Sequence, residues 1–143
     1  PSFLPWGRGY NPNLWSQVFD FPTGITLHNI NAGIDTGDIL CQREHSFDES
    51  ETLRTAYYNL QTSMLSLFSK SWRDIRSDKI IRKVQKLEDG NLFYKKHGEV
   101  ILPLLEKGWD TSLKELFSLR GRIKEELDKH GYGPRKSPQM PST

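Results

Sequence analysis

Between residues 53 and 75 the sequence repeats apolar side chains at intervals of three and four. This spacing is typical of an amphipathic α-helix, whose apolar side chains line one face. A long helix of this kind must cover another apolar surface, so the pattern predicts a sheet beneath it. The face is expected to be core and not a cofactor site, and it consists of Leu53, Tyr57, Leu60, Met64, Leu67, Phe68, Trp72 and Ile75.

Two segments ahead of this helix predict the strands on which it packs. Residues 24–30 and 39–45 are rich in β-branched and apolar side chains, and residues 31–37 between them hold two glycines and an aspartate. Asp48 and Glu51, three residues apart, fit a capping box at the start of the helix. We expect the helix to bury Tyr57, Leu60, Met64 and Phe68 against Ile25, Leu27 and Leu40.

Shorter elements are predicted on either side of this unit. Asn11 or Asn13 can cap a short helix that runs to about residue 19, with Pro12 in its first turn. Residues 80–87 and 92–96 flank a Glu-Asp-Gly-Asn turn, which predicts a hairpin.

The C-terminal part of the sequence predicts a helix and a tail. The helix begins after Asp110 or Ser112 and stops before Gly131. Proline and small polar residues then predict a disordered tail. The expected divisions of the chain are residues 1–78, a hairpin-plus-helix region at 79–130, and the tail at 131–143.

Composition excludes several classes of protein. Twenty Lys and Arg residues against 18 Asp and Glu residues leave a net charge of +2. Proteins that bind nucleic acid through phosphate contacts carry a larger positive charge, so a nucleic-acid partner is not expected. No run of eighteen apolar residues is present, so no membrane span is expected. The single cysteine, Cys41, excludes an internal disulfide framework and a cysteine zinc cluster. We expect a reducing, cytoplasmic setting and no metal site.

Two dense motifs then point to a family. Residues 1–9 (PSFLPWGRG), 24–28 (GITLH) and 33–38 (GIDTGD) resemble the formyltransferases that use 10-formyltetrahydrofolate. With residues 11–16 (NPNLWS) and 107–111 (KGWDT), the chain is most similar to the N-formyltransferases of nucleotide-linked amino sugars. It also resembles methionyl-tRNA formyltransferase. The resemblance is good over about residues 1–70, weaker to residue 111 and absent from the tail.

The resemblance implies an α/β fold, namely the trailing half of a Rossmann-like open sheet with a small α+β C-terminal extension. Residues 1–78 would then be the C-terminal half of the catalytic domain. An uncovered sheet edge invites association, so we expect the bare chain to dimerise, aggregate or remain partly folded.

The resemblance also implies a catalytic residue. Asp35 matches the family's catalytic aspartate, whereas the Asn and His of its Asn-x-His-Pro-Ser run would precede Pro1. The chain is therefore expected to be a fragment or truncated product that is inactive alone, or else a non-catalytic binding module. Without the resemblance, an aspartate in a glycine-rich loop is more often a turn former, a role that Asp38 fits better.

The remaining site residues follow from the same motifs. The segment Asn31, Ala32, Gly33 and Ile34 corresponds to the loop that closes over the pteridine of the folate through its backbone. Arg8 and Tyr10 lie in the loop that faces the amine substrate; Arg8 could grip a diphosphate, or it could simply be a surface ion-pair partner. His28 is either a supporting residue beside the reacting groups or a hydrogen-bonded core residue.

The function expected from the resemblance is formyl transfer from 10-formyltetrahydrofolate, as co-substrate, to the amine of a nucleotide-linked amino sugar. Formylation of methionyl-tRNA is the rival within the enzyme class, and it would require a basic domain of tRNA size. The region after residue 79 is short and only slightly basic, which disfavours that acceptor.

Overall fold

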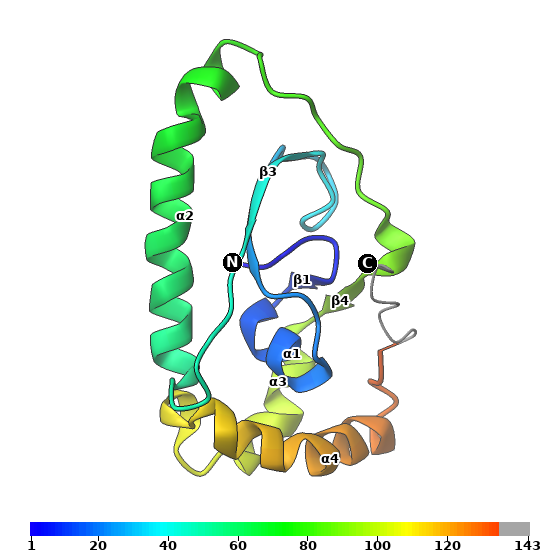
Figure 1. Cartoon of the computed structure of the whole chain (residues 1–143). Coiled ribbons are helices and arrows are strands. Elements are labelled where there is room, and N and C mark those ends of the chain that lie inside the picture. The colour runs from blue at the N-terminus through cyan, green and yellow to red at the C-terminus, as the bar shows by residue number, and fades with distance from the viewer. Residues whose placement is uncertain (135–143) are drawn as a thin grey trace, which may run out of the picture.

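The computed structural model describes residues 1–134, and residues 135–143 of the predicted tail lie outside this part. Figure 1 shows the long helix α2 along one side of the strands and α4 across one end. The helices and strands are β1 (Gly7–Gly9), α1 (Pro12–Phe19), β2 (Gly24–His28), β3 (Ile39–Glu44), α2 (Leu53–Arg76), β4 (Asn91–Phe93), α3 (Lys95–Ile101) and α4 (Leu113–Lys129). Single 3₁₀ turns lie at Leu87–Asp89, Leu102–Leu104 and Gly108–Asp110.

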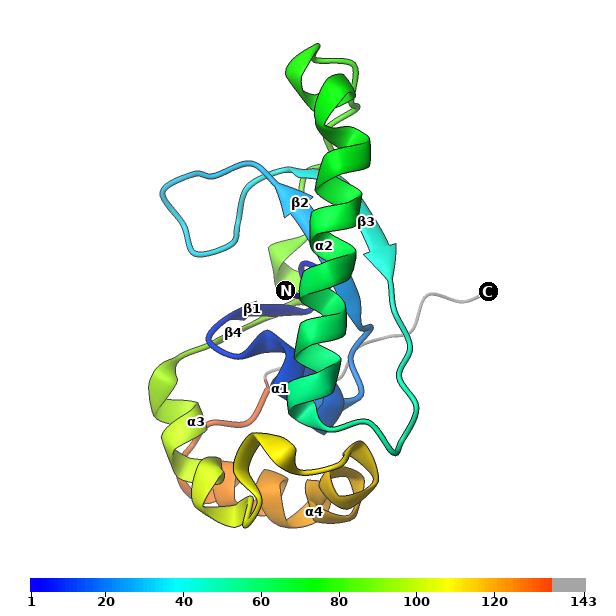
Figure 2. The same cartoon turned by 90° about the vertical axis from the view of Figure 1, so that its left-hand side faces the viewer.

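The strand–loop–strand–helix unit predicted from the pattern is present. Strands β2 and β3 pair antiparallel, with Gly24 opposite Glu44. Figure 2 shows α2 lying across both strands and the loop between them reaching away from the sheet. The Asp48 N–H does donate to Oε2 of Glu51, at 3.0 Å, as in the expected capping box. The N-cap of α2 is nevertheless Thr52, which exchanges hydrogen bonds with Thr55.

The buried face of α2 differs from the expected one. Leu60 is buried and packs with Ile25, and Met64 packs partly buried beside them, as expected. Tyr57 and Phe68, however, are 42% and 44% exposed. The two-stranded sheet covers only a narrow stripe of the helix, so the aromatic residues beside that stripe remain outside. The buried positions of α2 are Leu53, Ala56, Leu60 and Leu67.

The hairpin predicted at 80–87 and 92–96 is wrong. Strand β4 pairs in parallel with β1, with Arg8 opposite Leu92, and residues 95 and 96 already belong to α3. Gly90 suits the pairing of β4 with β1, since any side chain at this position would collide with the carbonyl of Pro5. The missing side chain permits the close approach of β4 to the N-terminal loop, where it pairs with β1.

The main core joins both sides of the expected boundary at residue 78. Trp15 of α1 is fully buried and stacks on Phe93 of β4, with ring centroids 4.6 Å apart. Side chains of α3 and α4 close this core, and Tyr132, in the expected tail, packs its ring on His97.

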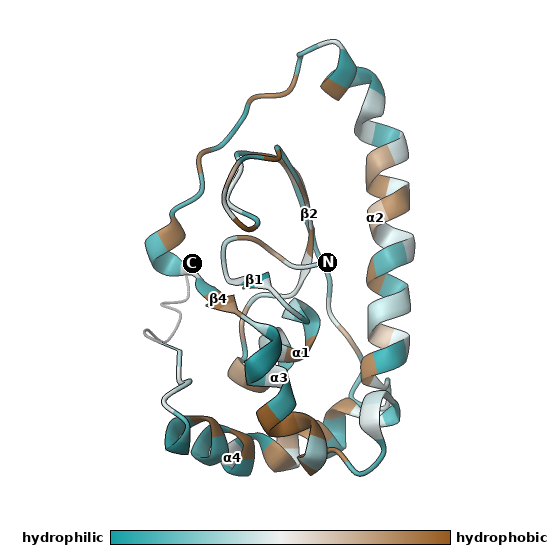
Figure 3. Ribbon diagram, turned by 180° about the vertical axis from the view of Figure 1, so that it is seen from behind, coloured by the Kyte–Doolittle hydropathy of each residue, from teal (hydrophilic) through white to brown (hydrophobic). Residues whose placement is uncertain are grey.

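Figure 3 shows apolar and polar positions alternating along α2. No helix within residues 1–134 is long and apolar enough to cross a membrane.

Candidate active site

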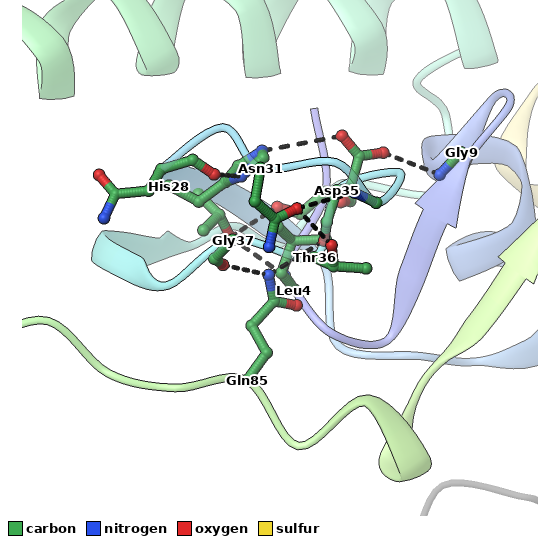
Figure 4. A network of polar contacts seen from close by, with 12 residues as sticks. Leu4, Gly9, His28, Asn31, Asp35, Thr36, Gly37 and Gln85 are labelled. Atoms are coloured by element: carbon green, nitrogen blue, oxygen red, sulfur yellow. Dashed lines mark hydrogen bonds and ion pairs between the residues drawn. The ribbon is translucent and has the colours of Figure 1, made fainter.

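Asp35 lies in the loop between β2 and β3, with its backbone in the left-handed region at φ 52°. Its Oδ2 accepts a hydrogen bond from the backbone N–H of Gly9 over 2.9 Å (Figure 4). The side chain remains 40% exposed. The carboxylate is therefore fixed in position and still reachable by a substrate.

His28 ends β2 and faces the same carboxylate. Its Nε2 lies 3.7 Å from Oδ1 of Asp35, and its Nδ1 lies 2.8 Å from the carbonyl oxygen of Asn29. Both ring nitrogens thus face oxygen atoms. The strand pairing becomes irregular between Leu27 and His28, which is where the chain turns toward the loop. The structure therefore brings together two residues that the sequence analysis singled out separately.

The segment 31–34 forms the exposed tip of this loop. Oδ1 of Asn31 accepts hydrogen bonds from the Gly33 N–H and the Thr36 hydroxyl, at 3.0 and 2.6 Å. A side chain at Gly33 would collide with Thr36. Asn31 therefore organises the loop from within, while Ala32 and Ile34 face outward and leave room for a flat ring near the backbone.

Arg8 and Tyr10 do not converge on one site. Gly9 between them has φ 88°, a conformation that suits glycine, and it turns the chain. Tyr10 lines a cavity of about 570 Å³, which we call the Tyr10 cavity, and Arg8 lines a second cavity of about 660 Å³, the Arg8 cavity. Arg8 and Tyr10 therefore line different cavities.

Residues of the N-terminal motif, of α1 and of α2 line the Tyr10 cavity. Tyr57, Tyr58 and Trp109 supply its aromatic walls. The Nδ2 of Asn11 and the Oδ1 of Asn13, both buried, have no hydrogen-bond partner within residues 1–134. At the rim, the hydrogen bond from Arg54 to Asp110 lowers the pKa of Asp110. Aromatic walls with unused amide groups are typical of sites that bind small polar rings.

The Arg8 cavity is lined by two basic residues, Arg8 and Lys96, and by the acidic Glu88. Lys96 lies over the rings of Tyr94 and Tyr132, 5.8 and 5.2 Å from their centroids. His97 also lines it, and burial, followed by the charge of Lys96, lowers the pKa of His97. The Nε of Arg8 is buried and unpaired among the described residues.

Sequence reasoning missed Gln85, which supports the Asp35 loop. Its Nε2 donates hydrogen bonds to the backbone carbonyls of Asp35 and Gly37, at 3.0 and 2.6 Å. The residue lies 50 positions after Asp35, inside the segment predicted as a strand. No local pattern in the sequence marks such a contact.

Comparisons with known proteins agree with this geometry. No protein-family model matches the chain. It is 31% identical over 110 residues to the dTDP-4-amino-4,6-dideoxyglucose formyltransferase of Mycobacterium bovis, covering 76% of this chain and 47% of that protein. It is 30% identical over 89 residues to a methionyl-tRNA formyltransferase of Caldanaerobacter subterraneus subsp. tengcongensis, covering 62% of this chain and 29% of that protein.

A solved structure extends the match. The formyltransferase PseJ from Anoxybacillus kamchatkensis, in complex with UDP-4,6-dideoxy-4-formamido-L-AltNAc and tetrahydrofolate, superposes with a TM-score of 0.76 at 43% identity. The match covers 80% of this chain and 60% of that one. Over most of its length the chain is therefore similar to formyltransferases. This confirms the α/β fold class expected from the motifs, although the chain spans only about half the length of the Mycobacterium relative.

Proposed function

We propose that the protein acts in formyl transfer from 10-formyltetrahydrofolate to the amine of a nucleotide-linked amino sugar. The observation that carries the proposal is the Asp35 carboxylate, held by the Gly9 N–H and facing His28 beside an exposed, small-residue loop. The family match supports it, since the Anoxybacillus formyltransferase binds a UDP-linked formamido sugar and tetrahydrofolate.

The chemistry requires groups of this kind. A neutral amine attacks the formyl carbon, negative charge develops on the formyl oxygen, and a proton moves from the incoming nitrogen to the departing one. Asp35 is assigned the role of orienting and charge-stabilising an imidazole and of holding a proton-relaying water. His28 is assigned a supporting role at that carboxylate. The backbone of residues 31–34 is assigned to the pteridine ring of the folate.

The amine-bearing sugar is assigned to the Tyr10 cavity. The assignment rests on the aromatic walls of this cavity and on the buried Nδ2 of Asn11 and Oδ1 of Asn13, which have no hydrogen-bond partner among the described residues. Pyranose rings stack on aromatic side chains, and their hydroxyl groups can both donate and accept hydrogen bonds, as Asn13 and Asn11 require. The assignment of Arg8 to a diphosphate rests on its guanidinium and on the basic neighbour Lys96.

An amino sugar is favoured over methionyl-tRNA as the acceptor. The match to the Anoxybacillus sugar enzyme combines 43% identity with 80% coverage of this chain. The methionyl-tRNA enzymes of Ehrlichia ruminantium and Thermodesulfovibrio yellowstonii reach 42% identity over 46% of this chain and 29% identity over 82% of it. The net charge of +2 offers little for a tRNA backbone.

Binding and turnover of the 143-residue chain test the proposal separately. Calorimetry with 5-formyltetrahydrofolate is expected to show binding, and single-turnover assays are expected to show no product, because these 143 residues contain no Asn-x-His run. Joining the portion of a sugar N-formyltransferase that ends in Asn-x-His ahead of Pro1 is expected to restore transfer. Absence of folate binding by both polypeptides would contradict the proposed function.

A further inference from the structure

The side chain of Gln85 is buried, with 7% of its surface exposed, although the residues on both sides of it are exposed. Both of its hydrogen-bond partners are backbone carbonyls, those of Asp35 and Gly37. Only the amide NH₂ can donate to them, so these partners fix the orientation of the side chain. Its Oε1 is left without a partner among the described residues, which is unfavourable unless the two donated bonds compensate.

Gln85 belongs to the segment 79–86 between α2 and β4, which we call the strap. An isolated β-bridge joins the strap to β3: Ile39 and Lys83 exchange backbone hydrogen bonds of 2.8 and 2.9 Å. Figure 4 shows the Gln85 side chain reaching from this segment to the loop that carries Asp35. The strap therefore has one backbone attachment and one side-chain attachment to the candidate active site.

The loop that carries Asp35 needs such support because its backbone conformation is uncommon and tightly packed. Asp35 adopts φ 52°, which is uncommon for residues other than glycine. Gly37 packs so closely on the carbonyl of Asn29 that a side chain would collide with it. The two carbonyls that Gln85 binds flank Thr36, so its amide fixes the turn that aims the Asp35 carboxylate at Gly9.

We propose that Gln85 is a positioning residue for the Asp35 carboxylate, holding it on the Gly9 N–H through the turn at residues 35–37. Its consequence for formyl transfer rests on the proposed function, whereas the positioning itself does not. The strap thereby makes the geometry of the Asp35 site depend on a segment that contributes no reacting group.

Amide hydrogen exchange of the 143-residue chain tests this directly. In Gln85→Met, which keeps the length of the side chain and removes its donors, the protection factor of the Gly9 amide is expected to fall about tenfold or more. The Lys83 and Ile39 amides, bonded to each other's carbonyls, are expected to remain protected. Lys86→Met, an exposed change on the same strap, is the control and is expected to leave Gly9 protected. Unchanged protection of Gly9 in Gln85→Met would overturn the proposal.

A second variant covers the case in which Gln85→Met unfolds. In Gln85→Glu the ionised carboxylate has no donor for the two carbonyl oxygens and is repelled by them. The protonated acid can donate one hydrogen bond. The Gly9 protection factor is expected to be low near pH 8 and to rise on acidification to about pH 5, because burial raises the pKa of a carboxyl group. Protection that equals the parent's at both pH values would also overturn the proposal.

Folate binding separates this inference from the proposed function. If the parent chain binds 5-formyltetrahydrofolate, Gln85→Met is expected to bind it about tenfold more weakly, because the loop of residues 31–34 is continuous with the turn. If the parent does not bind it, the proposed function fails, and the exchange of the Gly9 amide still decides the role of Gln85.

Discussion

The backbone N–H of Gly9 donates a hydrogen bond to the carboxylate of Asp35, which lies 26 residues later in the chain. This bond joins the N-terminal motif to the loop after β2, the two regions in which the family resemblance is densest. It places the carboxylate beside His28.

Asp35→Asn is expected to reduce formyl transfer about a hundredfold or more in the polypeptide that also carries Asn-x-His, because the negative charge is lost while the size is kept. Calorimetry is expected to show nearly unchanged binding of 5-formyltetrahydrofolate. Asp38→Asn is the matched control, and it is expected to change unfolding free energy by at most about 1 kcal/mol. Near-normal single-turnover rates in Asp35→Asn would refute the catalytic assignment.

Local patterns predicted part of this arrangement and missed the rest for a physical reason. The periodicity at residues 53–75 and the β-branched strands before it are properties of neighbouring residues, and both elements are present. The parallel pairing of β1 with β4 and the contact of Gln85 with Asp35 join distant residues. Gly90 and Gly37 are required by close backbone approaches that only the folded chain reveals.

The Tyr10 cavity gives a prediction about the acceptor. Asn13→Leu, which has similar volume and no polar group, is expected to weaken binding of a UDP- or dTDP-linked amino sugar about tenfold, because one hydrogen bond to the sugar is lost. Binding of 5-formyltetrahydrofolate is the internal control and is expected to be unchanged. Equal calorimetric affinities of parent and variant for the amino sugar would exclude this cavity as the acceptor site.

The corrected face of α2 can be tested by stability. Leu60→Ala is expected to lower the free energy of unfolding by about 2 to 5 kcal/mol, because a fully buried side chain is removed. Tyr57→Ala, on the exposed side of the same helix, is expected to change it by about 0.5 kcal/mol or less. Urea denaturation followed by circular dichroism measures both. A larger loss in the Tyr57 variant would restore the face expected from the periodicity.

Exposed aromatic side chains on α2 predict self-association. Phe68 and Trp72 pack on each other at 5.3 Å between ring centroids, yet both remain more than 40% exposed. Together with the two-stranded sheet, they leave apolar surface that a second copy can cover. Analytical ultracentrifugation is expected to show a concentration-dependent dimer or larger species, which Trp72→Glu shifts toward monomer. A parent chain that stays monomeric over a hundredfold range of concentration would contradict this.

His97 makes the stability of the chain dependent on pH. Its Nδ1 accepts a hydrogen bond of 2.9 Å from the Tyr94 N–H at the start of α3, which requires that nitrogen to be unprotonated. Burial also lowers the pKa of His97 in the folded chain, so the unfolded chain binds the proton at a higher pH. Stability is therefore expected to be level above the ordinary histidine pKa of about 6.5 and to fall as the pH drops below it, by at most about 1.4 kcal/mol per pH unit.

Urea denaturation at several pH values, compared between the parent and His97→Asn, isolates this contribution from that of the other histidines. The asparagine side-chain oxygen can still accept the Tyr94 N–H, but it does not titrate. The variant is therefore expected to lose less stability than the parent on acidification, while the two chains differ by a constant amount above neutral pH. Identical pH profiles would show that His97 titrates alike in the folded and unfolded chains, and that the Tyr94 hydrogen bond does not depend on its protonation.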